Sequence, residues 1–184
     1  ETAMAFATVG DIDIHYDLTD FTDPWQESEV VLLHHGFARN VDFWRPWVPL
    51  LARRYRVLRL DSRGCGKTTV PPPDAPYTLE MMVADALGLM DHLGIGKVHW
   101  AAEASGGIVG MALALAHPDR VASLTLCNTP VRLPEEKKDL FVPEEVRKTA
   151  LVRIFLDRGG IHGKPHRDAA GRPLVLANEI LDAV

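Results

Sequence analysis

Short apolar runs alternate with helical patterns through the first 130 residues, and this alternation limits the fold more than any other feature of the sequence. The run Val30–Leu33 is apolar at every position, which is typical of a strand buried on both faces. Further strands are predicted at residues 56–60, 98–102 and 121–127. Helices are predicted between them at residues 43–53, 78–93 and 106–116. Such regular alternation predicts a mostly parallel sheet with helices on both of its faces.

A hairpin is predicted ahead of this alternating region. Residues 5–9 and 12–16 alternate between apolar and polar positions. The intervening Gly10-Asp11 is typical of a tight hairpin turn, so we expect an antiparallel lead-in to the sheet.

The pattern changes after residue 130. Residues 131–143 are charged, and residues 144–157 have the pattern of an amphipathic helix. We therefore predict a core domain over residues 1–130 and the start of a helical lid or cap over residues 131–184.

Charge and composition exclude several classes of partner. The net charge of −5 gives no basic footprint for nucleic acid or an anionic membrane. No apolar run approaches the roughly 20 residues that span a bilayer, and Glu1–Met4 lacks the features of a signal peptide. Cys65 and Cys127 are too few for a disulfide framework and are predicted to be reduced thiols. These features predict a cytoplasmic protein.

Residues 98–107, VHWAAEASGG, carry the strongest chemical signal in the chain. A strand runs directly into a helix through a turn flanked by small residues, which is the setting of the nucleophile elbow G-x-S-x-G. The positions two before and two after the nucleophile must be small, because strand and helix backbones nearly touch there. Both are small when Ala104 is central, whereas centring on Ser105 puts Glu103 where there is no room. We predict Ala104 at the nucleophile position; the alternative is an ordinary strand-to-helix turn.

Three further motifs accompany this turn. They are LHHGF at residues 33–37, DSRGCGKT at residues 61–68 and HPDRV followed by LTLCN within residues 117–128. In this order and spacing the chain resembles the α/β-hydrolase family over residues 5–130, and within it the serine ester and lactone hydrolases of the enol-lactonase type. The family's elbow has serine where this chain has Ala104. The resemblance implies an α/β-hydrolase fold with further C-terminal strands that this sequence does not contain.

The resemblance also implies an oxyanion hole. Its donors would be the backbone N–H groups of Phe37 and Ser105, and Ser105 opens a helix, where N–H groups are unpaired. One of His34 and His35 is expected to orient the loop through a hydrogen bond, with a direct chemical role for either as the alternative. The predicted substrate-binding residues are Gly36, Phe37, Trp44 and Glu103. For Phe37 and Trp44, packing in the core is the alternative.

Residues 64–68 end like the phosphate-binding loop G-x-x-x-x-G-K-[ST]. That pattern requires glycine where Asp61 stands, and a carboxylate there would repel phosphate. We instead expect Asp61 and Arg63 to pair or cap locally.

The acid and the histidine of a catalytic triad are harder to place. They follow the nucleophile in the family's chain order. Asn128, after the sixth strand, cannot be a charged partner, so Asp182 is the candidate acid, although its segment also fits a lid helix. His162 and His166 precede Asp182, which is the wrong order. Either the chain is a fragment or segments of the parent protein are missing from it.

These residues predict a cofactor-independent and metal-free hydrolase that acts on a small-molecule ester or lactone. Alanine has no nucleophilic atom, so the chain as it stands is expected to be inactive. We favour a deliberate serine-to-alanine exchange at Ala104, because the rest of the elbow remains fit for catalysis. A non-catalytic ligand receptor, a natural pseudo-hydrolase and a carbon–carbon bond hydrolase are the alternatives, and a homodimer stays open.

Overall fold

The computed structural model describes residues 2–129 and 151–155 and shows the expected mostly parallel sheet. The strands are β1 (Thr2–Val9), β2 (Ile12–Thr19), β3 (Val30–His34), β4 (Arg56–Leu60), β5 (Val98–Glu103), β6 (Val121–Cys127) and β7 (Leu151–Phe155). The helices are α1 (Val48–Leu51), α2 (Leu79–His92) and α3 (Ser105–Ala116), with 3-10 helices at Val41–Trp47 and Pro118–Arg120. Every strand and helix predicted before residue 130 is present.

The strands form a seven-stranded sheet in the order β1-β2-β4-β3-β5-β6-β7. The hairpin of β1 and β2 is antiparallel, with Gly10 at φ +57° in its turn, and β2 joins β4 in the antiparallel sense. All pairs from β4 to β7 are parallel. The predicted lead-in and the predicted parallel core are therefore both confirmed.

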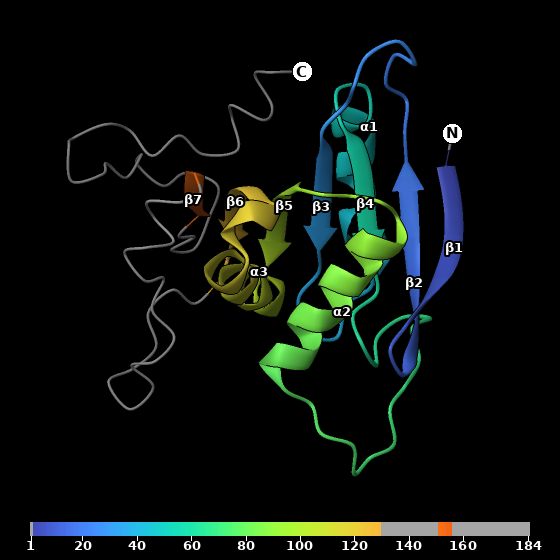
Figure 1. The fold of residues 1–184 in the computed structure, drawn as a ribbon, viewed down its shortest axis with the longest axis vertical. Coiled ribbons are helices and arrows are strands. Elements are labelled where there is room, and N and C mark those ends of the chain that lie inside the picture. Colours follow the sequence, from blue (N-terminus) through green and yellow to red (C-terminus); the bar gives the residue numbers. More distant parts are fainter. Residues whose placement is uncertain (1, 130–150, 156–184) are drawn as a thin grey trace, which may run out of the picture.

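Helices cover both faces of this sheet. Figure 1 shows α2 and α3 in front of the sheet and α1 behind it. The front layer belongs to the larger apolar cluster, in which Trp100 of β5 is fully buried, and the rear layer packs α1 on Val57 of β4. Because side chains alternate along a strand, each central strand contributes apolar residues to both clusters, which explains the unbroken apolar run of β3.

The carboxyl ends of the central parallel strands meet at one edge of the sheet. His34 of β3 lies opposite Leu60 of β4 and Ala102 of β5, and Glu103 lies opposite Cys127 of β6. Each of the recognised motifs except HPDRV, which leads into β6, runs over or follows one of these ends. An open parallel sheet binds ligands at this edge, so the fold brings the motifs together where a site is expected.

One element differs from the sequence prediction. A helix is predicted over residues 144–157, but Leu151–Phe155 forms strand β7, which pairs with β6 in parallel. The helix prediction is therefore wrong for these five residues. The run LVRIF is short and largely apolar, and such a run suits a buried strand as well as one turn of helix. The boundary expected at residue 130 stays a prediction, although these five residues join the sheet.

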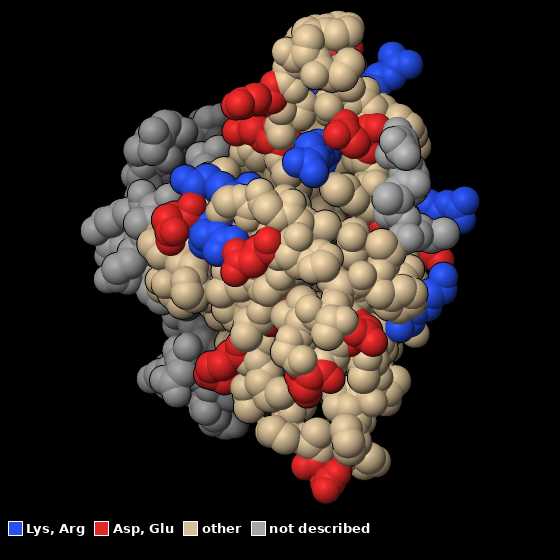
Figure 2. Space-filling view, turned by 45° about the vertical axis from the view of Figure 1, so that its right-hand side comes forward, with Lys and Arg blue, Asp and Glu red and all other residues tan. Residues whose placement is uncertain are grey.

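The described surface is mixed in charge. Figure 2 shows Lys and Arg side chains interspersed with Asp and Glu over the face in view. Among the residues that the structure describes, no helix is long and apolar enough to cross a membrane.

Candidate functional site

Ala104 occupies a strained turn between β5 and α3. Its backbone has φ 49° and ψ −117°, a conformation that side-chain-bearing residues rarely adopt. The Ala104 N–H donates to the carbonyl of Cys127 over 3.0 Å, and its carbonyl accepts from Gly107 over 3.0 Å. The strain therefore falls on residue 104, while Ser105 is already the first residue of α3.

Glycines allow the neighbouring segments to approach this turn. A β-carbon on Gly106 would lie 2.6 Å from the carbonyl oxygen of His35 and 2.8 Å from that of His34. One on Gly107 would collide with the side chain of Thr129. The obstacles at Gly106 include backbone atoms, which cannot easily move aside. The predicted need for a small residue two positions after Ala104 is therefore confirmed.

The two histidines after β3 fasten the loop that faces the elbow. Nδ1 of His34 lies 2.8 Å from the carbonyl of His35, and Nδ1 of His35 lies 2.7 Å from that of Gly36. A carbonyl only accepts, so both Nδ1 atoms carry the proton. Nε2 of His35 then accepts from the Ser62 N–H over 2.9 Å. An orienting role was expected for one of these histidines, and the structure shows such hydrogen bonds for both rings.

Both rings are held in the neutral state. Burial lowers the pKa of His34 to about 3, and the adjacent His35 ring adds to this effect. Burial also lowers the pKa of His35. His34 stacks on Trp100, with ring centroids 5.2 Å apart, and Trp100 in turn donates to the carbonyl of Gly106 over 3.2 Å. The loop, the strand and the elbow are therefore linked through one buried stack.

The two predicted oxyanion donors have no competing partner. Neither the Phe37 N–H nor the Ser105 N–H donates to another residue within the described part of the chain. Ser105 begins the 12-residue helix α3, whose first N–H groups lack intrahelical partners. The helix dipole also favours negative charge at this end. Their function as an oxyanion hole stays a prediction.

Glu103 lies beside the elbow and against the histidine loop. A β-carbon on Gly36 would collide with Oε2 of Glu103 and would lie 2.9 Å from the β-carbon of Ala104. Glu103 is 9% exposed, and its Oε2 accepts no hydrogen bond. The same atom lies 3.3 Å from Nε of Arg39, which forms an ion pair without hydrogen-bond geometry. Arg39 had no signal in the sequence, because only the fold places it beside Glu103.

The loop after β4 has an acidic centre. Asp61 is 1% exposed and accepts from the N–H groups of Val41 and Lys67 over 2.7 and 2.9 Å, and from Nδ1 of His15 over 2.8 Å. A β-carbon on Gly66 would collide with its carboxylate. Asp61 therefore caps its own loop as predicted, and its carboxylate takes the loop N–H donor of Lys67.

Arg63 acts over a longer range than the sequence suggested. It bonds both carboxylate oxygens of Asp85 on α2, over 2.9 and 2.7 Å, and both of Asp11 in the hairpin turn, over 3.0 and 2.9 Å. These partners raise the pKa of the Arg63 guanidinium, the hydrogen bonds to Asp85 having the largest effect. The expected local pairing of Arg63 is replaced by a bridge between three segments.

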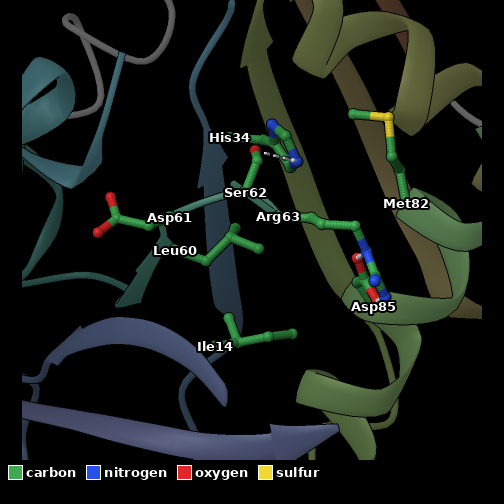
Figure 3. A pocket seen from close by; sticks show the side chains of 8 residues that line it. All are labelled: Ile14, His34, Leu60, Asp61, Ser62, Arg63, Met82 and Asp85. Atoms are coloured by element: carbon green, nitrogen blue, oxygen red, sulfur yellow. Dashed lines mark hydrogen bonds and ion pairs between the residues drawn. The ribbon is translucent and has the colours of Figure 1, made fainter. Parts of the chain in front are cut away.

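A small pocket lies between this loop and α2 (Figure 3). Its lining comprises Ile14, His34, Leu60, Asp61, Ser62, Arg63, Met82 and Asp85. It includes His34, whose Nε2 lies 3.4 Å from Oγ of Ser62, but not Ala104. The pocket therefore differs from the predicted substrate site. Its charged groups already have partners, since Arg63 pairs with Asp85 and Asp61 pairs with His15.

The predicted substrate-binding residues fall into different settings. Gly36 and Glu103 lie beside Ala104. Phe37 is 87% exposed, whereas Trp44 is 4% exposed and packs in the rear apolar cluster. This burial favours the core alternative for Trp44, and its contact with a substrate stays a prediction. Asp182, His162 and His166 lie outside the described residues.

Comparison with known proteins places this site in a wider context. A family model described as "alpha/beta hydrolase fold" matches residues 29–161. The chain is 40% identical over 126 residues to "Putative carbamate hydrolase RutD" of Caulobacter vibrioides. The aligned region covers 68% of this chain and 46% of that protein. It is 38% identical over 116 residues to a fluoroacetate dehalogenase of a Burkholderia species, covering 61% of the chain and 38% of that protein.

A solved structure agrees in fold as well as in sequence. The enol-lactonase from Burkholderia xenovorans LB400 is 34% identical and superimposes with a TM-score of 0.65, over 71% of this chain and 48% of that one. The chain spans about half the length of the relatives that it matches.

Proposed function

The chain belongs to the α/β-hydrolase fold family, and on that premise we propose that the protein hydrolyses a carboxylic ester or lactone through a nucleophile at position 104. The observation that carries the proposal is the strained backbone of Ala104, at φ 49° between a buried parallel strand and the start of a helix. A turn of this kind holds one side chain at the carboxyl edge of the sheet, beside unpaired N–H groups.

The chemistry follows from a serine at this position. Its oxygen attacks the carbonyl carbon while a histidine takes its proton, and a carboxylate orients that histidine. The negative charge that develops on the carbonyl oxygen is stabilised by the N–H groups of Phe37 and Ser105, each typically worth about 10²–10³ in rate. Asp182 is our candidate for the carboxylate. This mechanism uses no metal or cofactor.

The relatives favour a carbonyl substrate. A lactone and a carbamate, named for two of the similar proteins, both present a carbonyl carbon to a nucleophile. The fluorinated carbon of fluoroacetate, named for the third, is saturated, so the attack that expels fluoride puts no negative charge on a substrate carbonyl oxygen. Two unpaired N–H groups beside the elbow therefore support an ester or lactone over a haloacid.

Because alanine has no nucleophilic atom, we expect the chain with Ala104 to be inactive. Removal of a catalytic serine typically lowers turnover on the order of 10⁶-fold. The test introduces Ala104→Ser into the full-length protein and assays a panel of esters and lactones, with labelling by a serine-directed phosphonate. Turnover together with a label on residue 104 supports the proposal. Absence of both refutes it.

A matched control excludes a second reactive serine. Ser123 Oγ lies 2.7 Å from Nδ1 of His99, and Nε2 of His99 lies 3.3 Å from Glu29, so this serine has polar neighbours of the same types as a triad serine. It lies near the opposite edge of the sheet from Ala104. The labelling is therefore repeated in an Ala104→Ser, Ser123→Ala variant, in which the label on residue 104 must persist.

A second candidate function follows from Ala104 itself. If the native gene encodes alanine at this position, the protein is a non-catalytic ligand receptor built on the same fold. This candidate expects tight binding of a carbonyl ligand, no turnover after Ala104→Ser, and no phosphonate label on the new serine. The labelling experiment therefore separates the two candidates.

A further inference from the structure

The loop that carries the Phe37 N–H is held at both ends by one pair of charged side chains. At its start, Gly36 packs against the carboxylate of Glu103 so closely that no β-carbon fits. At its end, Arg39 lies 3.3 Å from the same carboxylate and 4.2 Å from the centre of the Phe43 ring. Between them Ala38 has φ 56°, a left-handed conformation that favours glycine. The loop is thus fixed in a conformation that it would not adopt unaided.

The carboxylate of Glu103 creates an electrostatic problem at this place. It is 9% exposed, and its Oε2 accepts no hydrogen bond within the described part of the structure. Its charge acts on its surroundings, because burial and Glu103 together raise the pKa of the neighbouring Cys127 thiol to about 11. An anion forming between the Phe37 and Ser105 N–H groups would meet this negative charge at close range. Arg39 is the cation that lies against it.

We propose that Arg39 is a positioning residue of the oxyanion hole, which acts by cancelling the charge of Glu103 beside residues 36–39. This proposal rests on the function proposed above, since it assigns the pair to that site. Oε2 of Glu103 is covered by the protein, so the charge on this atom acts on the site through its field rather than by touching a substrate.

The proposal predicts an asymmetry between the two residues. Without Arg39 the uncompensated carboxylate opposes any bound anion, whereas without Glu103 no such charge remains. At an effective dielectric constant of about 20, a unit charge a few ångströms away changes the stability of an anion by about 10²–10³-fold. Removal of both residues should therefore harm anion binding less than removal of Arg39 alone.

The experiment is a double-mutant cycle read out by binding. Sodium butyrate, whose carboxylate mimics the oxyanion, is titrated into the full-length protein with Ala104 in place, and affinity is measured by NMR. We expect Arg39→Met to weaken binding tenfold or more. Added Glu103→Gln should restore affinity to within about threefold of the starting protein. Arg56→Met is the matched control, because Arg56 is similarly exposed and paired 3.6 Å from Asp20 at the far edge of the sheet.

Other outcomes overturn the proposal. If Arg39 and Glu103 only held the loop in its conformation, the double variant would bind butyrate as poorly as Arg39→Met does. Direct capture of the carboxylate by Arg39 also predicts no rescue. Unchanged affinity in all variants excludes the pair from the site.

The same cycle in the Ala104→Ser background separates this proposal from the proposed function. There Arg39→Met should lower kcat with little change in KM, and Glu103→Gln should restore kcat. If butyrate binding shows the rescue but the serine variant has no turnover, the hydrolase proposal fails and the charge compensation stands. If turnover is present without rescue, the charge compensation fails alone.

Discussion

Replacement of Ala104 by glycine should stabilise the protein, although glycine loses more conformational entropy on folding than alanine does. Backbone held at φ 49° and ψ −117° is typically strained by about 1–3 kcal/mol in a residue with a β-carbon, and glycine removes that strain. Against this, glycine adds about 0.4–1 kcal/mol of unfolded-state entropy. Loss of a half-buried methyl costs a few tenths of a kcal/mol, from about 0.8 kcal/mol per buried carbon. The net gain is about 1 kcal/mol.

Urea unfolding of the two proteins measures this difference directly. A gain of about 1 kcal/mol raises the melting temperature of a chain of this size by roughly 2–4 °C. The matched control is Ala112→Gly in the interior of α3, where the same exchange should destabilise by about 1 kcal/mol. If Ala104→Gly destabilises as much as the control, residue 104 is not strained and the assignment of the elbow to it is wrong.

Three further predictions concern the neighbourhood of this turn. Gly106→Ala should destabilise by about 1–3 kcal/mol in urea unfolding, because its β-carbon meets two backbone carbonyls, while Gly96→Ala, with open space around it, should not. Because His34 has a folded pKa of about 3 against an ordinary 6.5, its contribution to stability is complete above pH 6.5 and declines as the pH falls toward 3. His34→Gln should flatten the pH dependence of the unfolding free energy in that window. Cys127, with its pKa raised to about 11, should react slowly with iodoacetamide at pH 8 in the native protein, and Glu103→Gln should speed this reaction by removing a charge that raises the pKa.

The core of the fold was predictable because its strands and helices carry their signals locally. The unbroken apolar run of β3 and the hairpin turn at Gly10 depend on neighbours in the sequence, and the structure places both as expected. At Leu151–Phe155 the local signal was ambiguous. Pairing with β6 made this run a strand, and no residue within it specifies that partner.

The candidate site was predictable only where its chemistry belongs to one short segment. The small residues around Ala104 identify the turn because their spacing in the sequence is itself the steric requirement. Arg39 and Glu103 are 64 positions apart in the sequence, on the loop after β3 and at the end of β5, and their ion pair exists only once those strands lie side by side. The partners of Arg63 were missed for the same reason.

The elbow keeps its strained conformation without the hydroxyl that such a turn would serve. No side-chain hydrogen bond caps the turn at Ala104, so the strain has its origin in the surroundings. Those surroundings are the hydrogen bond to Cys127, the packing of Gly106 on the histidine loop and the packing of Gly36 beside Glu103. Because each is independent of the side chain at 104, a serine introduced there meets a backbone already shaped for it. We therefore expect Ala104→Ser to change activity far more than it changes stability.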